Sequence, residues 1–182
     1  MKIAKSTFYL LHLFILSILL SGCGDNSVEN KMYGTWEVSA FFSNADFEKF
    51  SEEPIPDGVE VEMTIQGTQK YHKGGKYNFE GEVTMRMKSA EGEIPLKFYI
   101  KNAGEWSLHA SGKELVETTT DGTFTALDEL TEAFLKESPE LAASFKPIKG
   151  ETETSRILSI SETVMEIQED ETKITLTMNK KR

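Results

Sequence analysis

The sequence predicts a mainly-β domain built as an antiparallel meander, with one short helical insert at about 127–145. Three observations support this prediction: segments in which apolar and polar residues alternate, short turn-like linkers between them, and a single stretch with helical spacing. Alternation with a period of two places one face of a sheet in the core and the other in water, as in antiparallel sheets. Strands that follow one another through tight turns are typical of β-sandwiches and up-and-down barrels.

The first 22 residues have the features of a secretory signal peptide. Lys2 and Lys5 are the only charged residues before Asp25, and they precede an almost wholly apolar run over residues 8–20. A run of about 13 residues is shorter than the roughly 20 that a membrane-spanning helix needs. A basic start, a short apolar core and small residues after it indicate a secreted or envelope protein.

The segment Leu20-Ser21-Gly22-Cys23 resembles the lipobox of bacterial lipoproteins. The resemblance implies cleavage before Cys23, diacylation of its sulfur with chains such as palmitate, and acylation of the new amino terminus. Two or more acyl chains hold a protein stably at a membrane, whereas one chain does so only marginally. Gly24, in place of an aspartate after the cysteine, favours the outer membrane on its periplasmic side. The alternative is that Cys23 is a small apolar residue of an uncleaved signal anchor.

The chain after the signal peptide is strongly acidic and large enough for one domain. Loss of Lys2 and Lys5 leaves 18 basic against 30 acidic residues, a net charge of −12. This charge disfavours nucleic acid as a partner, because phosphates attract Lys and Arg. No disulfide can form within the chain, since Cys23 is its only cysteine. We expect an acylated cysteine and tether over residues 23–31 and a single domain over 32–182.

Alternating apolar residues predict the positions of the strands. After a first strand near Trp36, the expected strands include residues 59–65, 77–87, 94–100 and 106–110, and two more lie between 164 and 178. Short polar or glycine-containing segments predict the turns, among them 72–77, 102–104, 111–113, 120–122 and 168–172. In the first of these, Gly74 and Gly75 supply the positive φ angles that a tight hairpin requires.

One segment departs from the β pattern. Its apolar residues recur at helical spacing: Leu127, Leu130, Phe134, Leu141 and Phe145. Ser138 and Pro139 suit an N-cap and a first helical position, so we expect two short helices at about 127–137 and 139–145. We expect these helices to pack on the sheet or to cover one mouth of a barrel.

The segment Gly34-Thr35-Trp36 resembles the Gly-x-Trp opening of the lipocalin and lipocalin-like (calycin) proteins. The stretches at 104–108 and 157–180 are similar to strands of bacterial lipocalin-like domains. The resemblance implies an up-and-down barrel of about 8–10 strands in which Trp36 closes one end. Read without the resemblance, Trp36 and Trp106 are large aromatic residues of the core.

If the sheet closes into a barrel, its inward-facing side chains form either an apolar pocket or a filled core. Methionine and aromatic side chains suit an adaptable pocket, and they suit a packed interior equally well. The candidate pocket-lining residues are Trp36, Val61, Met63, Phe79, Val83, Met85, Met87, Phe98, Ile100 and Met178.

The sequence carries no catalytic or metal-binding motif that we can identify. His72 and His109 lack a second ligand at metal spacing, and no nucleophile elbow or phosphate-binding loop is present. We therefore expect no enzyme activity, no metal and no cofactor. Two functions remain: an envelope lipoprotein whose barrel binds a small apolar molecule or lipid, and a non-catalytic envelope protein with a filled barrel that acts through protein contacts. The sequence identifies no protein partner.

Overall fold

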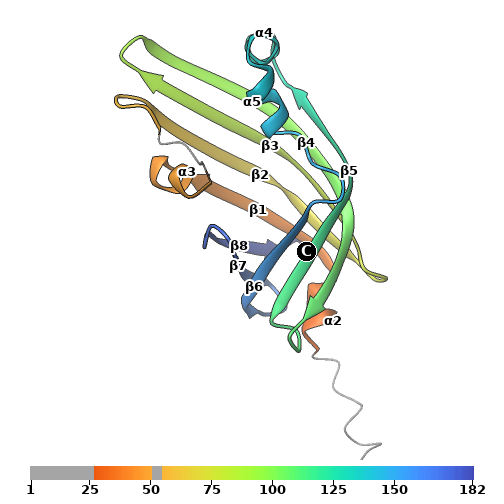
Figure 1. The fold of residues 1–182 in the computed structure, drawn as a ribbon. Helices are drawn as coiled ribbons and strands as arrows, with labels where there is room; N and C mark the ends of the chain where they lie inside the picture. The colour runs from red at the N-terminus through yellow and green to blue at the C-terminus, as the bar shows by residue number, and fades with distance from the viewer. Residues whose placement is uncertain (1–26, 51–54) are drawn as a thin grey trace, which may run out of the picture.

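The computed structural model describes residues 27–50 and 55–182, and within them the chain forms a closed antiparallel β-barrel (Figure 1). The strands follow one another around the barrel in chain order, and β1 pairs with β8 to close it. The strands are β1 (Gly34–Phe42), β2 (Glu60–His72), β3 (Lys76–Ser89), β4 (Gly92–His109), β5 (Glu114–Ala126), β6 (Thr152–Ile160), β7 (Val164–Glu169) and β8 (Thr175–Lys180). The predicted mainly-β meander is confirmed, and the barrel is the form that it takes.

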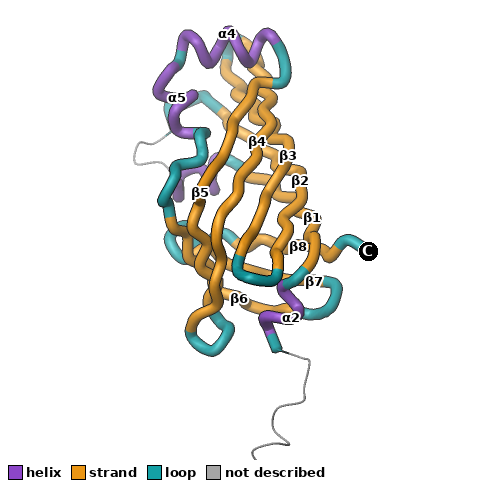
Figure 2. The backbone as a smooth tube through the Cα atoms, turned by 90° about the vertical axis from the view of Figure 1, so that its right-hand side faces the viewer, coloured by secondary structure: helices purple, strands orange, loops and turns teal. Residues whose placement is uncertain are grey.

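The strands differ in length, which gives the barrel a closed half and an open half. Strands β2 to β5 have 13 to 18 residues, whereas β7 and β8 have six each. The long strands therefore extend beyond the closed part as a curved sheet (Figure 1). The helices are α2 (Val28–Met32), α3 (Asn44–Phe50), α4 (Glu129–Glu137) and α5 (Pro139–Ser144). Helix α2 lies at one end of the molecule, and α4 lies at the other (Figure 2).

The helical insert is confirmed as α4 and α5, which meet at Ser138 and Pro139. The side chain of Asp128 caps α4 by accepting a hydrogen bond of 2.8 Å from the backbone N–H of Thr131. Phe145, directly after α5, stacks on Phe98 of β4 with ring centroids 5.0 Å apart. The insert thus packs on the extended sheet. Its apolar stripe is only partly used, because Leu127 and Leu130 remain exposed while Phe134, Leu135 and Phe145 pack against the sheet.

Trp36 closes the barrel at the end where α2 lies. Its ring is fully buried, and its Nε1–H donates to the carbonyl of Met32 at 2.8 Å. The Lys180 ammonium lies 5.0 Å from the ring centroid and donates to the carbonyl of Lys31 at 2.8 Å. Gly34 has a φ of +127°, and a Cβ there would lie 2.7 Å from Cε of Lys180. This is the position that the lipocalin resemblance implies for Trp36.

Two segments that the sequence suggests as turns lie inside strands. Residues 102–104 belong to β4 and residues 120–122 to β5, where the register shifts between Ala103 and Gly104. The extra residue of this bulge breaks the alternation, so turn-like residues mark a bend within a strand instead of its end. The hairpin at Gly74 and Gly75 is formed as predicted, with φ angles of +91° and +72°.

The structure describes only part of the N-terminal region for which the sequence makes predictions. The signal peptide, residues 1–22, and Cys23 lie outside the described residues. Helix α2 takes up residues 28–32, which overlap the end of the expected tether, and its Met32 is fully buried. Across residues 27–50 and 55–182, none of the helices has the length and hydropathy needed to cross a bilayer.

The packing of Trp36 predicts a large effect of its removal. We expect Trp36→Ala to lower the free energy of unfolding by about 3–5 kcal/mol, because it leaves a cavity and removes the hydrogen bond to Met32. Phe41→Ala is the matched control on the same strand, since Phe41 is 63% exposed. Urea unfolding followed by circular dichroism measures both. Equal transition midpoints for the two variants would contradict this role of Trp36.

Candidate ligand-binding cavity

The interior of the barrel contains a partly open cavity of about 330 Å³ next to the residues that close its end. Side chains from all eight strands line it: Val38, Ile65, Gln69, Tyr71, Tyr77, Phe79, Ile100, Asn102, Glu117, Glu153, Ser155, Ile167, Glu169, Leu176 and Met178. A cavity of about 150 Å³ is enough to hold a benzene molecule in other proteins. The interior of this barrel therefore has room for a small organic molecule.

A second hollow of about 670 Å³ forms the mouth of the barrel. It shares four lining residues with the inner cavity, namely Ile65, Glu153, Glu169 and Leu176, so the two spaces adjoin. Phe42 and Met63 form an apolar side of the mouth, and the turn between β7 and β8 forms an acidic side. A ligand that enters here passes between apolar side chains and carboxylates before it reaches the inner cavity.

The structure places the ten predicted pocket-lining residues in four different regions of the molecule. Phe79, Ile100 and Met178 line the inner cavity, and Met63 lines the mouth. Trp36 lies in the packed cluster at the closed end. The other five belong to an apolar cluster of the extended sheet, beneath α4 and α5: Val61, Val83, Met85, Met87 and Phe98. The structure thus brings together three of the ten residues around the inner cavity and places half of the set in a separate core.

A polar group in the wall of the cavity is built from β2 and β5. The buried Gln69 donates from Nε2 to Oε1 of Glu117 at 2.7 Å, and the buried Tyr71 also hydrogen bonds to Glu117. The surface that Glu117 retains faces the cavity, because this residue belongs to its lining. A carboxyl group in such a place is held in a fixed position by its two neighbours and is open to a ligand.

The surroundings of Glu117 change its acidity. Burial raises the pKa of its carboxyl from 4.5 to about 7, and the charge of Glu153 adds to this effect. The hydrogen bonds from Tyr71 and Gln69 act in the opposite direction but are outweighed. At neutral pH this carboxyl is therefore divided between its protonated and ionised forms.

Glu153 lies directly opposite Glu117 in the register of β5 and β6. Although Glu153 is exposed as a whole residue, the walls of the cavity remove water from its carboxyl and raise its pKa. The negative charges of Glu151, Glu169 and Glu171 raise it further. Like charges that face each other across two strands destabilise a sheet, so this pair is unfavourable unless something neutralises it.

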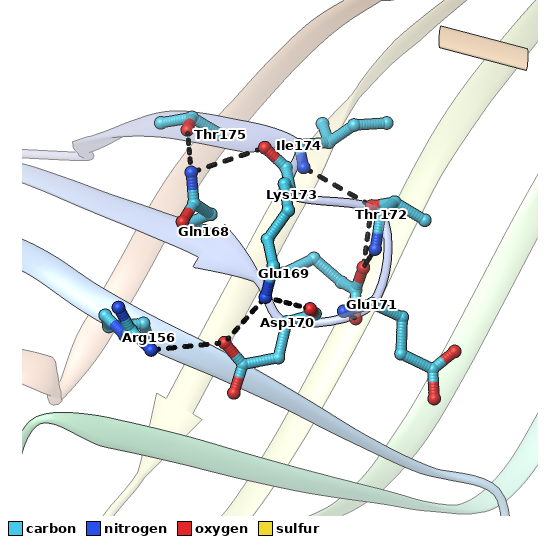
Figure 3. Close-up of polar contacts among 9 residues, drawn as sticks. All are labelled: Arg156, Gln168, Glu169, Asp170, Glu171, Thr172, Lys173, Ile174 and Thr175. Carbon is cyan, nitrogen blue, oxygen red and sulfur yellow. Dashed lines mark hydrogen bonds and ion pairs between the residues drawn. The ribbon is translucent and has the colours of Figure 1, made fainter. Parts of the chain in front are cut away.

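The turn between β7 and β8 holds a further carboxylate at the mouth (Figure 3). Thr172 donates to Glu169 from its hydroxyl at 2.6 Å and from its backbone N–H at 2.5 Å, and the N–H of Glu171 donates at 2.7 Å. Burial raises the pKa of Glu169, but these hydrogen bonds and the charge of Lys173 outweigh burial and lower it. Glu169 is therefore an ionised carboxylate that is fixed in place at neutral pH.

A second polar cluster lies beside the bulge in the pairing of β4 with β5. The Tyr77 hydroxyl lies 3.2 Å from Oγ1 of the buried Thr119, and Nδ2 of Asn102 donates to the same oxygen at 3.3 Å. The Oδ1 atom of Asn102 is buried and receives no hydrogen bond from the described part of the chain. Asn102 lines the cavity, and its Oδ1 atom is covered by the surrounding side chains.

Sequence reasoning missed Gln69, Tyr71, Glu117 and Glu153 as interior residues. Glutamate is rarely buried, so a pattern of alternating polar residues places it on the wet face. The signal that points to Glu117 is its position two residues after Leu115, on the same face of β5. The turn-like residues at 120–122 prevented β5 from being recognised as a strand. The alternation within β5 was therefore not used to place Glu117.

The cavity has acidic groups but no set of metal ligands. Among residues 27–50 and 55–182, no group of three or more His, Cys, Asp or Glu side chains is arranged to hold a metal ion. The geometry suits reversible binding of an organic molecule through hydrogen bonds and apolar contact.

A scan of known protein families found none that matches this chain, and a search of curated proteins found no match.

The raised pKa of Glu117 predicts a pH-dependent effect of its neutralisation. A carboxyl with a raised folded-state pKa stabilises the fold fully below the unfolded value of 4.5, and that contribution is lost as the pH rises through about 7. We compare the free energy of unfolding of Glu117→Gln with that of the wild type at each pH. We expect this difference to shift in favour of the variant by roughly 1–3 kcal/mol between pH 4.5 and pH 8. Thermal or urea unfolding at both pH values measures this difference.

Glu82→Gln is the matched control for this experiment, because Glu82 is exposed on the outer face of β3. We expect it to show a difference from the wild type that changes little with pH. A Glu117→Gln variant that is equally destabilised at pH 4.5 and pH 8 would refute a desolvated carboxyl at this position.

Proposed function

We propose that this chain is a lipid-anchored protein of the bacterial envelope whose barrel binds a small, largely apolar molecule. The observation that supports binding is the inner cavity of about 330 Å³, which adjoins a mouth lined by Phe42, Met63 and Ile65. A barrel filled by its own side chains, which would favour action through protein contacts alone, leaves no interior space of this size. Most of the cavity wall is apolar, with a few polar groups that fix orientation, as in small-molecule sites.

The anchor and the cavity fit one orientation. The lipobox-like Cys23 lies four positions before Ser27, the N-cap of α2, and α2 packs at the closed end of the barrel (Figure 1). Acyl chains on Cys23 would hold the closed end towards the membrane and leave the mouth towards the periplasm. In this orientation the cavity exchanges its ligand with the aqueous phase.

Native mass spectrometry of the protein purified from its own cells tests binding. We expect a co-purified small molecule on the wild type and its loss in Leu176→Trp, because Leu176 lines both the mouth and the inner cavity. Thr177→Trp places the same side chain on the outer face of β8 and is expected to retain the ligand. A wild-type protein that carries no ligand mass and that binds no apolar probe would favour the alternative of a surface-acting protein.

The lipid anchor is tested separately from binding. We expect Cys23→Ser to abolish labelling by radioactive palmitate and to release the protein from membranes or leave it unprocessed. Ser21→Ala is the control, since it keeps a small residue before the cysteine. Unchanged palmitate labelling of Cys23→Ser would contradict the lipobox interpretation.

A further inference from the structure

The charge of the cavity is of one sign. Glu117, Glu153 and Glu169 line the inner cavity, and Glu151 and Glu171 join them at the mouth. No Lys, Arg or His belongs to the described residues that line either space. The nearby cations Arg156 and Lys173 lie on the rim, where both pair with Asp170 (Figure 3).

The carboxylate pair at the centre is unfavourable as it stands. Glu117 and Glu153 are directly opposite across β5 and β6, and each raises the energy of the other when both are ionised. Gln69 and Tyr71 hold Glu117. The carboxylate of Glu153 accepts no hydrogen bond and forms no ion pair with any described residue. A positive charge between the two carboxylates would remove this repulsion.

The unused hydrogen-bonding capacity of the cavity is of the acceptor type. The carboxylate of Glu153 lines the cavity and accepts no hydrogen bond from any described residue. A ligand that satisfies this group must donate hydrogen bonds. An ammonium group has both the donors and the charge.

The remaining wall of the cavity is apolar, and it determines what kind of cation fits. Val38, Ile65, Ile100, Leu176 and Met178 face the same space as the two carboxylates. A metal ion would leave this wall without a partner, and the described residues offer no cluster of three ligands for one. A hydrocarbon group that packs against these side chains is removed from water, which favours its binding.

We propose that the cavity selects an amphipathic organic cation, with its ammonium group bound between Glu117 and Glu153 and its hydrocarbon part against the apolar wall. This inference rests on the proposed function, since it names the class of ligand that the same cavity takes. The acidic mouth, with Glu151 and Glu171, attracts such a cation towards the opening. An anionic or uncharged lipid would leave the carboxylate pair without a counter-charge.

Binding of a cation depends on the ionisation of these carboxyls. The titratable groups that face Glu117 are Tyr71 from β2, Tyr77 from β3 and Glu153 from β6, and Glu169 of β7 lines the same cavity. An alkylammonium group resembles that of lysine, with a pKa near 10.4, so it stays charged at neutral pH. The affinity therefore follows the carboxyls and decreases as the pH falls through about 7, where Glu117 becomes protonated.

The test compares n-hexylamine with 1-hexanol, which have the same hydrocarbon chain and differ in charge. The full chain is reconstituted in phosphatidylcholine nanodiscs, and isothermal titration calorimetry is corrected with empty nanodiscs. At pH 8.5 we expect hexylamine to bind at least tenfold more tightly than hexanol, and we expect this preference to decrease at pH 5.5. Glu117→Gln and Glu153→Gln should each reduce the preference, while Glu82→Gln should keep it.

The possible outcomes distinguish failure of the cation selection from failure of the proposed function. Equal binding of hexylamine and hexanol by the wild type would overturn the selection of cations and leave the binding of apolar molecules in place. Binding of neither compound would overturn both. A preference for hexylamine that persists unchanged in the double variant Glu117→Gln/Glu153→Gln would show that the cation binds elsewhere, which also overturns the inference.

Discussion

The pairing of β1 with β8 is the constraint on which the rest of this molecule depends. It joins Trp36, Glu37 and Val38 to the last strand and converts a meander of hairpins into a closed surface. Without this seam, the side chains of Gln69 and Glu117 would lie on one face of an open sheet and would be surrounded by water. With it, they are enclosed, and the acidity of Glu117 changes accordingly. Closure also brings Lys180 close to the start of β1, so that its ammonium contacts both the ring of Trp36 and the carbonyl of Lys31.

The interior is divided into two apolar clusters with a polar layer between them. One cluster surrounds Trp36 and Trp106 at the closed end, and the other surrounds Phe98 beneath α4 and α5. Each cluster is packed and supports the fold by burial of apolar surface. The layer between them contains the cavity and the carboxyl pair, which do not stabilise the empty protein. Natural proteins commonly retain such destabilising groups at functional sites.

The sequence predicted the barrel well because strands such as β2 and β3 obey a strict alternation. Val61, Met63 and Ile65 on β2 and Val83 and Met85 on β3 indicated which face is buried, and Pro139 marked the junction of the two helices. The candidate site was less accessible to prediction. Its decisive residues are a buried glutamine and two glutamates, which in a sequence are indistinguishable from surface residues, and their proximity depends on the pairing of β5 with β6. The bulge at Thr120 further concealed β5, the strand that carries Glu117.

The closing seam differs from every other strand pair in its place along the chain. All other neighbouring strands are consecutive, whereas Trp36 of β1 pairs with Lys180 of β8, which follows it by 144 positions. Contacts between residues so distant in the chain carry the largest loop-closure entropy and form only after the local hairpins have restricted the chain. We therefore expect the barrel to acquire its interior late in folding. Until then, we expect the carboxyl pair to be hydrated and to ionise as in an unfolded chain.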